Sequence, residues 1–502
     1  MNQFNFKISH ANIMATPTAL HHPHHIVLLP FLAHGHLSPF LALARQIKHT
    51  SKAFTITIAT TALNLKYLRQ STNHGDDILF AELPFSHHDR QSTENLAISK
   101  IPDLCHESLS LQSPFRQLIR DIIAKDGRPP LCIISDVFFG WAIDVANSLG
   151  TLNFTFTTGG AYGTMAYISL WLHLPHRQTD SSDFALPCFP ERCRFCRGKL
   201  NSYLRSADGD DPWSRFMQPQ ISLSLKSHGW LCNTVEEIEP LGIKLLRDYI
   251  HRPVWSIGGS SSLSKKNTYT GKEVNICSNK LEKWLDEQEP GSVIYVSFGS
   301  QNTIGSSQMI ELAKGLERSR KPFVWVVRPP LGYNIKGEFR SEWLPKGFEQ
   351  RMTEAKQGLV VRDWAPQLKI LSHKSTGVFV SHCGWNSIME SLSHGVPIVG
   401  WPLGAEQVYN SKMLREEMGV SVELASGVDS IVYEEEVLKV IDIAMDGNGK
   451  GGEMRKNASL IKEQIIDANN IREDGKVRGS SVKALEDFLT HVLTMTSKEE
   501  IQ

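Results

Sequence analysis

Two polar side chains follow predicted buried strands, and together they could move a proton. His36 comes after the apolar run 24–31, and Asp136 ends the run 131–136. Imidazole titrates near neutral pH and can remove a hydroxyl proton, and a carboxylate bonded to its far nitrogen fixes the tautomer and stabilises the imidazolium. Because the chain has 20 histidines, chance placements are common, and His34 is a competitor two residues away. His36 and Asp136 are therefore a candidate base and its orienting acid, with His34 left open.

A second set of groups lies in the stretch 364–407. Within it, TGVFVSHCG followed by WNSIMESLSHG predicts a strand, a tight turn and a helix that Gly395 ends. Residues 382–387, HCGWNS, fall at the turn, where the first N–H groups of the helix have no internal partner and the helix dipole is positive. We therefore expect this turn to bind phosphate.

The rest of this stretch could bind a base, a ribose and a sugar. Trp364 follows the strand-like GLVVRD and could offer its indole to a base, and Glu390 could accept hydrogen bonds from ribose hydroxyls. Glu406 and Gln407 come after a second strand, PIVGWPL, and carry the carboxylate and amide that a sugar requires. Each residue alone is more often structural, since a tryptophan usually packs and a helical acid is usually solvated. Their combination favours a nucleotide-sugar site.

The 44 residues from Trp364 to Gln407 resemble the donor-binding signature of plant family 1 UDP-glycosyltransferases, the secondary-product glucosyltransferases. The resemblance implies that Trp364 stacks on uracil. A terminal Gln in this signature goes with UDP-glucose, whereas a terminal His goes with galactose, so Gln407 implies glucose. The resemblance further implies a donor site in which Gln367 and Glu390 hold the ribose, His382, Gly384, Asn386 and Ser387 bind the diphosphate, and Trp385, Glu406 and Gln407 bind the sugar. Ala365 is a further predicted donor-binding residue.

The same resemblance decides between the two histidines. The family's catalytic base is the His of a Gly-His dipeptide after the first strand, which matches Gly35-His36, and its orienting Asp matches Asp136. Thr158 resembles a residue that contacts the sugar, and Ser300 one near the phosphates. The implied reaction is a single in-line displacement that inverts the anomeric carbon and gives a β-glucoside. UDP-glucose is then a co-substrate, and no metal or other cofactor is expected.

Composition fits an enzyme that binds small neutral ligands. The chain has 502 residues, with 53 basic and 53 acidic side chains, so nothing indicates a nucleic acid or an anionic membrane as a partner. The eight cysteines are widely spread with no secretory signal, which predicts reduced thiols and a cytoplasmic location. Cys193 and Cys196 lack a second CxxC, which argues against zinc. No apolar run is long enough to span a membrane, and we expect a monomer.

Strands and helices alternate along the chain, which predicts an α/β protein with two Rossmann-like domains facing each other across a cleft, the GT-B fold. Ser38 is predicted to cap the first helix, with Pro39 at its first position. Residues 175–211 read as a long surface excursion. The predicted organisation is a disordered lead (1–23), an N-terminal acceptor-binding domain (24–255), a linker (256–290), a C-terminal UDP-sugar-binding domain (291–478) and a C-terminal helix (479–502). The resemblance implies that this helix packs back on the N-terminal domain.

The acceptor is the least defined part of the prediction. Residues 61–130 and 160–215 should shape its pocket, and Phe85, Trp141, Phe184 and Trp213 fit an apolar molecule. A flavonoid or other phenolic is favoured, with a terpenoid or the sugar of an existing glycoside left open. A nicotinamide-dependent oxidoreductase is disfavoured because the first loop, LAHGHL, lacks GxGxxG. A non-catalytic nucleotide-sugar binder remains the alternative from another class, although the presence of both His36 and Asp136 argues against it.

Overall fold

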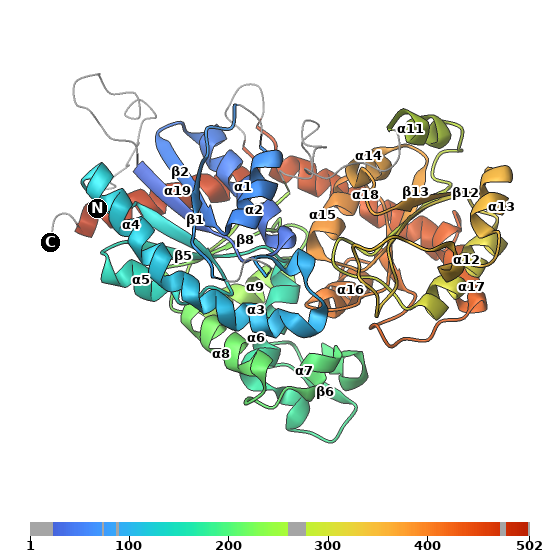
Figure 1. Cartoon of the computed structure of the whole chain (residues 1–502), viewed down its shortest axis with the longest axis horizontal. Coiled ribbons are helices and arrows are strands. Elements are labelled where there is room, and N and C mark those ends of the chain that lie inside the picture. Colours follow the sequence, from blue (N-terminus) through green and yellow to red (C-terminus); the bar gives the residue numbers. More distant parts are fainter. Residues whose placement is uncertain (1–23, 73–74, 87–89, 260–277, 472–477, 500–502) are drawn as a thin grey trace, which may run out of the picture.

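The computed structural model describes residues 24–72, 75–86, 90–259, 278–471 and 478–499, which form two parallel sheets lying side by side (Figure 1). The predicted lead, 1–23, and the middle of the predicted linker, 260–277, lie outside the described residues. Helices cover both faces of each sheet, as in doubly wound proteins. The predicted α/β fold with two Rossmann-like units is confirmed.

The first sheet has seven parallel strands in the order β3-β2-β1-β4-β5-β8-β9. They are β1 (His24–Leu29), β2 (Phe54–Thr60), β3 (Leu79–Glu82), β4 (Cys132–Asp136), β5 (Leu152–Thr157), β8 (Trp230–Cys232) and β9 (Val254–Ser256). The strand order reverses between β1 and β4, so their carboxyl ends open a crevice where ligands bind in such sheets. Leu29 pairs with Ser135, which brings the residues after β1 beside Asp136.

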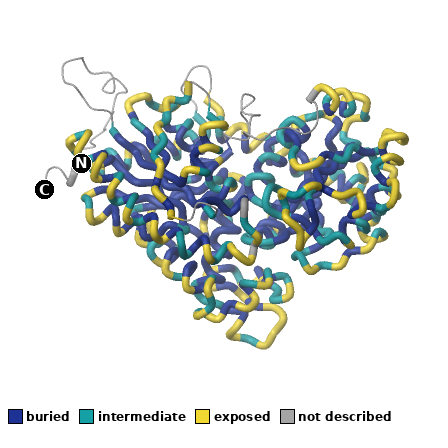
Figure 2. Tube along the Cα trace, in the orientation of Figure 1, coloured by how far each residue is buried: buried dark blue, intermediate teal, exposed yellow. Residues whose placement is uncertain are grey.

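Side chains of β1 alternate between two apolar cores because successive residues of a strand point to opposite faces. Ile26 and Leu28 belong to a core with α1, α2 and α19, whereas Val27 and Leu29 belong to a core that includes six other helices of the first unit. The three helices on the first face are α1 (His34–Thr50), α2 (Ala62–Gln70) and α19 (Ser480–Glu499). Those on the second face are α3 (Ile101–Glu107), α4 (Gln112–Asp126), α5 (Ala142–Ser148), α6 (Ala161–His173), α8 (Pro212–Ser224) and α9 (Pro240–Ile250). Apart from the edge strand β3, which has no buried residue, the strands are buried throughout most of their length (Figure 2).

The second sheet has six parallel strands in the order β12-β11-β10-β13-β14-β15. They are β10 (Val293–Ser297), β11 (Phe323–Val327), β12 (Gly358–Arg362), β13 (Thr376–Ser381), β14 (Ile398–Gly400) and β15 (Ser421–Glu423). One face is packed by α12 (Ser306–Ser319), α13 (Phe348–Glu354) and α17 (Glu434–Met445), and the other by α11 (Ser278–Asp286) and α14 (Gln367–Ser372). In α11, Leu281 and Leu285 are buried, so this end of the range predicted as a linker packs with the second sheet.

Three further helices join the two units. They are α15 (Trp385–Ser393), α16 (Gln407–Glu416) and α18 (Lys450–Ala468). Their buried residues, such as Ile388, Met413 and Ile465, belong to the same apolar cluster as Val27 and Leu29 of the first sheet. One continuous core therefore runs from the first unit into the second.

The excursion 175–211 contains regular structure. β6 (Asp183–Ala185) and β7 (Arg194–Cys196) form a small antiparallel hairpin, and α7 (Ser202–Ser206) follows it. Phe184 and Phe195 stack across the hairpin with their ring centroids 6.3 Å apart, and both are buried in the main core. This segment therefore packs against the first unit instead of lying loosely over it.

The predicted start of the first helix is wrong. α1 begins at His34, because Ala33 is extended and its carbonyl accepts hydrogen bonds from the N–H groups of His36 and Leu37. Pro39 therefore lies inside the helix, and the Ser38 hydroxyl bonds to the Tyr67 hydroxyl instead of capping it. As a result, His34 and His36 lie on the first turn of a helix and not in a loop.

The final helix, α19, packs on the first sheet although the second unit precedes it in the chain. Phe488 is fully buried, and its ring meets Phe154 of β5 edge-on at 5.0 Å and Trp255 of β9 at 5.2 Å. Within the described ranges, no helix has the length and apolar character that crossing a bilayer requires.

Removing the Phe488 ring should destabilise the first unit. We expect Phe488→Ala to lower the free energy of unfolding by about 3–5 kcal/mol, because it removes an aromatic side chain from a packed core and leaves a cavity. Urea denaturation followed by tryptophan fluorescence measures this change. Thr490→Ala on the exposed side of the same helix is the control, with an expected effect within about 0.5 kcal/mol. Equal effects of the two substitutions would show that α19 does not stabilise the sheet.

Candidate active site

His36 and Asp136 lie together at the crevice between β1 and β4. The His36 Nδ1 atom is 2.7 Å from Asp136 Oδ2, and the second carboxylate oxygen accepts the N–H of Phe138 at 3.1 Å. Asp136 is fully buried, whereas His36 lines a cavity. The rings of Phe31 and Phe138 flank the imidazole at 5.5 and 5.6 Å. The geometry fixes the imidazole so that Nε2 is the nitrogen left to meet a ligand.

Two opposing effects act on the pKa of His36. Burial lowers this pKa, but the charge of Asp136 and its hydrogen bond to Nδ1 raise it, and the net result is a pKa above the usual 6.5. The Thr158 hydroxyl lies 3.2 Å from the same Nδ1 atom. Thr158, expected from the sequence to contact a sugar, thus lies beside the imidazole while also lining the cavity.

The cavity has a volume of about 600 Å³ and lies between the two sheets. Its polar end is formed by residues of the second unit that the sequence singled out: Ser300, His382, Gly384, Trp385, Asn386, Ser387, Glu406 and Gln407. Its other end is apolar and comes from the first unit: Phe31, Ile101, Phe138, Tyr167, Tyr203, Trp213, Met217 and Ile221 are among its lining residues. A ligand could thus contact an apolar wall and a polar wall at once, with His36 between them.

Only one of the four aromatic residues expected in the apolar pocket lies there. Trp213 lines the cavity and stacks on Tyr203 at 4.7 Å, but Phe85, Trp141 and Phe184 are buried within the core. Sequence reasoning missed the other apolar lining residues. Their apolar spacing is the same as that of core residues, so no local signal distinguishes them.

The turn between β13 and α15 presents an open helix end. Gly384 is the N-cap of α15 and no side chain caps the helix there, so its first N–H groups are available to a ligand. The His382 ring fits between Gly299 and Gly384, because a Cβ on either glycine would lie 2.8 or 2.4 Å from that ring. Burial, assisted by the nearby Arg328 charge, lowers the pKa of His382 to about 4. His382 is therefore a neutral imidazole at physiological pH.

A smaller cavity of about 180 Å³ adjoins the first and contains the other predicted donor residues. It is lined by Trp364, Ala365, Gln367, Ser387 and Glu390, and Ser300 and Ser387 line both cavities. The Gln367 amide nitrogen donates to Glu390 at 2.7 Å and to the Ser387 hydroxyl at 3.1 Å. Burial raises the pKa of Glu390 to about 7. The two cavities meet at the open end of α15.

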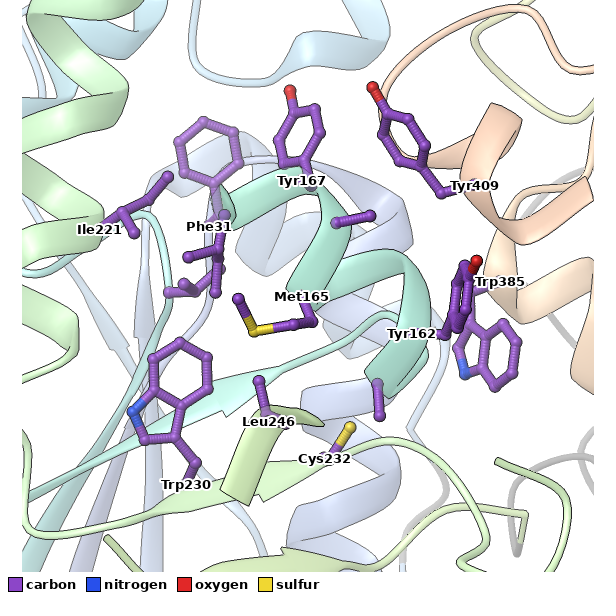
Figure 3. Packing of buried hydrophobic residues seen from close by; sticks show 14 of the residues in the cluster. Phe31, Tyr162, Met165, Tyr167, Ile221, Trp230, Cys232, Leu246, Trp385 and Tyr409 are labelled. Carbon is purple, nitrogen blue, oxygen red and sulfur yellow. The ribbon is translucent and has the colours of Figure 1, made fainter. Parts of the chain in front are cut away.

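Trp385 and Asn386 tie the two units together. The Trp385 indole N–H donates to the carbonyl of Asn233 at 2.6 Å, and its ring packs where a Cβ on Gly160 would lie only 2.8 Å away. Figure 3 shows this indole at the edge of the core cluster that contains Tyr162. Asn386 donates from Nδ2 to the carbonyl of Gly35 at 2.9 Å. The Trp385 indole, expected from the sequence to bind a sugar, is thus also committed to the contact between units.

The start of α16 places Glu406 and Gln407 on the polar wall. The Gln407 amide oxygen accepts the N–H groups of Leu403 and Gly404, both at 2.9 Å, which leaves its amide nitrogen to donate to a ligand. Burial raises the pKa of Glu406, and the nearby charge of His36 opposes that rise. His36, the open helix end and the two residues that close the signature therefore share one cavity.

Metal ligands are not clustered in the described part of the chain. No group of three or more His, Cys, Asp or Glu side chains there could hold a metal ion, and Cys193 and Cys196 are free thiols.

Comparisons with known proteins show the family to which the chain belongs. Residues 268–446 match the family model described as UDP-glucoronosyl and UDP-glucosyl transferase. UDP-glycosyltransferase 92A1 of Arabidopsis thaliana is 40% identical over 93% of this chain and 97% of its own length. Crocetin glucosyltransferase 3 of Crocus sativus is 42% identical over 84% of this chain and 90% of its own.

A solved structure shows the same architecture. UGT71G1 of Medicago truncatula, complexed with UDP-glucose, superposes with a TM-score of 0.77 at 25% identity and covers 93% of this chain and 98% of its own. The similarity confirms the predicted GT-B fold. The cavity combines an open helix end with a His–Asp pair, and the curated relatives match this chain along nearly their whole length. This chain therefore belongs to the UDP-glycosyltransferase family and is a UDP-dependent glycosyltransferase.

Proposed function

We propose that the protein is an inverting UDP-glucose-dependent O-glucosyltransferase acting on a hydroxyl of a small apolar secondary metabolite. The observation that carries the proposal is the 2.7 Å bond from His36 to Asp136 in a cavity that also contains the open end of α15. A base and a site for a leaving diphosphate are the two components that such a displacement requires. In this proposal, residues 24–255 bind the acceptor and residues 291–478 bind the donor.

The donor extends from the smaller cavity into the larger one. Uracil stacks on Trp364, with Ala365 beside it, and the ribose hydroxyls bond to the Gln367–Glu390 pair. The diphosphate meets the N–H groups at 384–387, together with Ser300 and His382, where the cavities join. Glucose lies against Glu406 and Gln407, close to His36. The continuity of the two cavities supports this order.

The reaction is a single displacement at the anomeric carbon. His36 Nε2 takes the acceptor's hydroxyl proton while the acceptor oxygen forms a bond to C1 and the bond from C1 to the phosphate oxygen breaks. UDP leaves from the opposite face with the bonding electron pair, and the product is a β-glucoside. Asp136 stabilises the imidazolium that forms, and the preorganised N–H groups of α15 stabilise the growing charge on UDP. Because these fixed dipoles already supply a positive potential, we propose that the reaction needs no metal.

The apolar end of the larger cavity supports an apolar acceptor, and a flavonoid or other phenolic is favoured. Stacked Tyr203 and Trp213 offer flat faces to an aromatic ring. A terpenoid or an existing glycoside remains the alternative acceptor, and a non-catalytic nucleotide-sugar binder the alternative class. We also propose that the enzyme works in the cytosol, because the seven cysteines within the described residues are all free thiols.

Transfer should depend on His36. With UDP-glucose and a panel of flavonols, simple phenols, terpenoid alcohols and their glucosides, we expect a hexose adduct by mass spectrometry with the wild type in the presence of EDTA. His36→Ala should lower the rate by about 10²–10⁴-fold because the base is lost, while the UDP affinity measured by calorimetry stays within about twofold. His34→Ala is the matched control and should retain most activity. Near-normal turnover of His36→Ala would refute the base, and UDP binding with no adduct on any acceptor would favour the binding-protein alternative.

The pH profile should reveal the effect of Asp136 on His36. In wild type, the acid limb of kcat/KM should have an apparent pKa above 6.5, since only the unprotonated imidazole can act as a base. Asp136→Asn removes the charge that raises this pKa and leaves the burial that lowers it, so the limb should move to lower pH. The same variant should lose about 10²-fold or more of its maximal rate because orientation is lost. The control is Asp144→Asn, which replaces an exposed carboxylate on α5 and should leave the acid limb in place. An acid limb that does not move in Asp136→Asn would contradict the pairing of His36 with Asp136.

Donor preference should depend on Gln407. In Gln407→His, the imidazole cannot accept both backbone N–H groups that the amide oxygen accepts in the wild type. The imidazole also presents a different hydrogen-bond donor to the sugar. We expect kcat/KM for UDP-glucose to fall about tenfold or more, and the ratio of UDP-glucose to UDP-galactose use to fall with it. Gln407→Glu keeps an acceptor oxygen for the two backbone N–H groups and replaces the N–H donor by a carboxylate oxygen, so it separates loop support from hydrogen-bond donation to the sugar. An unchanged donor ratio in Gln407→His would show that this residue does not select the sugar.

A further inference from the structure

The carbonyl of Gly35 lacks its normal partner within α1. In an α-helix this oxygen would accept the N–H of the residue four positions later, which is Pro39, and proline has no N–H. The proline ring also crowds the carbonyl four residues earlier and tilts it away from the helix axis. Pro39 therefore leaves a strong acceptor available immediately before His36.

A side chain from the second unit uses this acceptor. Asn386 Nδ2 donates to Gly35 O at 2.9 Å. Asn386 is the second residue of α15, at the helix end proposed to bind the diphosphate, and Gly35, His36 and Asn386 all line the larger cavity. This hydrogen bond joins the backbone next to the base directly to the donor-binding helix.

We propose that Pro39 and Asn386 form a positioning pair that fixes the base relative to the donor, an inference that rests on the proposed function. Pro39 keeps the Gly35 carbonyl free, and Asn386 holds that carbonyl, so the first turn of α1 and α15 move as one body. Another polar contact of α15 with the first unit, from the Trp385 indole to Asn233, is made to the loop after β8 and not to α1. Since a displacement requires the reacting atoms within a few tenths of an ångström of their productive positions, the Gly35 contact should govern turnover more than donor affinity.

Replacing the proline tests the pair because the new N–H would compete for the same carbonyl. In Pro39→Ala, the amide of residue 39 can donate to Gly35 O, and the carbonyl can swing back toward the helix axis. We expect kcat to fall about three- to tenfold, with a change in UDP affinity below twofold. The melting temperature should stay equal or rise, because α1 gains a hydrogen bond. If Pro39 only stabilised the fold, Pro39→Ala would instead lower the melting temperature.

A double-mutant cycle identifies the partner. Asn386→Ala removes the donor, so in that background Pro39→Ala should change kcat by less than twofold while its effect on the melting temperature persists. Pro219→Ala, at another proline inside a helix, in α8, is the matched control. Pro219→Ala should change kcat by the same factor in the wild type and in the Asn386→Ala background. Equal effects of Pro39→Ala in both backgrounds, or no effect in either, would overturn the proposal.

Hydrogen exchange gives a readout that does not need turnover. In wild type, UDP should protect the amides of α15 and also those of residues 33–37, whereas in Pro39→Ala the protection should stop at α15. Absence of any glycoside from the wild type would count against the proposed function alone. Identical UDP-induced protection of residues 33–37 in wild type and Pro39→Ala would overturn the coupling even if transfer is observed.

Discussion

The bond between His36 and Asp136 depends on the order of strands in the first sheet. A fully buried carboxylate without a partner is destabilising by several kcal/mol, so Asp136 is tolerated at the end of β4 only because an imidazole and the Phe138 N–H meet it there. The imidazole is in reach because β1 lies next to β4, at the point where the strand order reverses. Had another strand separated them, the carboxylate would lack its imidazole partner, and the charge that raises the pKa of His36 would be absent. The fold thus positions the proposed base before any ligand arrives.

The proposed displacement also requires the second unit to be held at a fixed distance from His36, and several close contacts between the units do this. Gly160 leaves space for the Trp385 ring, and the indole N–H satisfies a backbone carbonyl of the first unit. Apolar residues of α15, α16 and α18 extend the core of the first sheet without interruption. Because a packed interior deforms little, these contacts limit how far the open end of α15 can move from His36. The two units therefore form one cavity, with an apolar wall from the first unit and a polar wall from the second.

Features that are encoded locally could be predicted from the sequence, and features set by distant packing could not. The strand, turn and helix around His382 follow from an apolar run, small residues and helical spacing, and each lies where the pattern indicated. The sequence places the start of α1 too late, because proline is common in the first turn of a helix. Here Pro39 lies inside the helix, and the Gly35 carbonyl, which would bond to an N–H at position 39, accepts the side chain of Asn386 instead. Phe85 and Trp213 look alike as sequence signals, but only the packing of distant helices decides that one is core and the other lines a cavity.

In the proposed donor site, the open start of α15 supplies positive potential as fixed dipoles. His382 is neutral because burial and Arg328 disfavour its charged form, and the Arg328 guanidinium is itself engaged by the carbonyls of Ser300 and Asp363 at 2.6 and 2.7 Å. Beside Ser300 and His382, the start of α15 offers the proposed diphosphate a row of backbone N–H groups, which need no reorientation when charge develops on a leaving group. A mobile lysine in the same place would have to be ordered during the reaction and would bind the departing anion more strongly as a point charge. A site built on the backbone can therefore stabilise the transition state and still release its product.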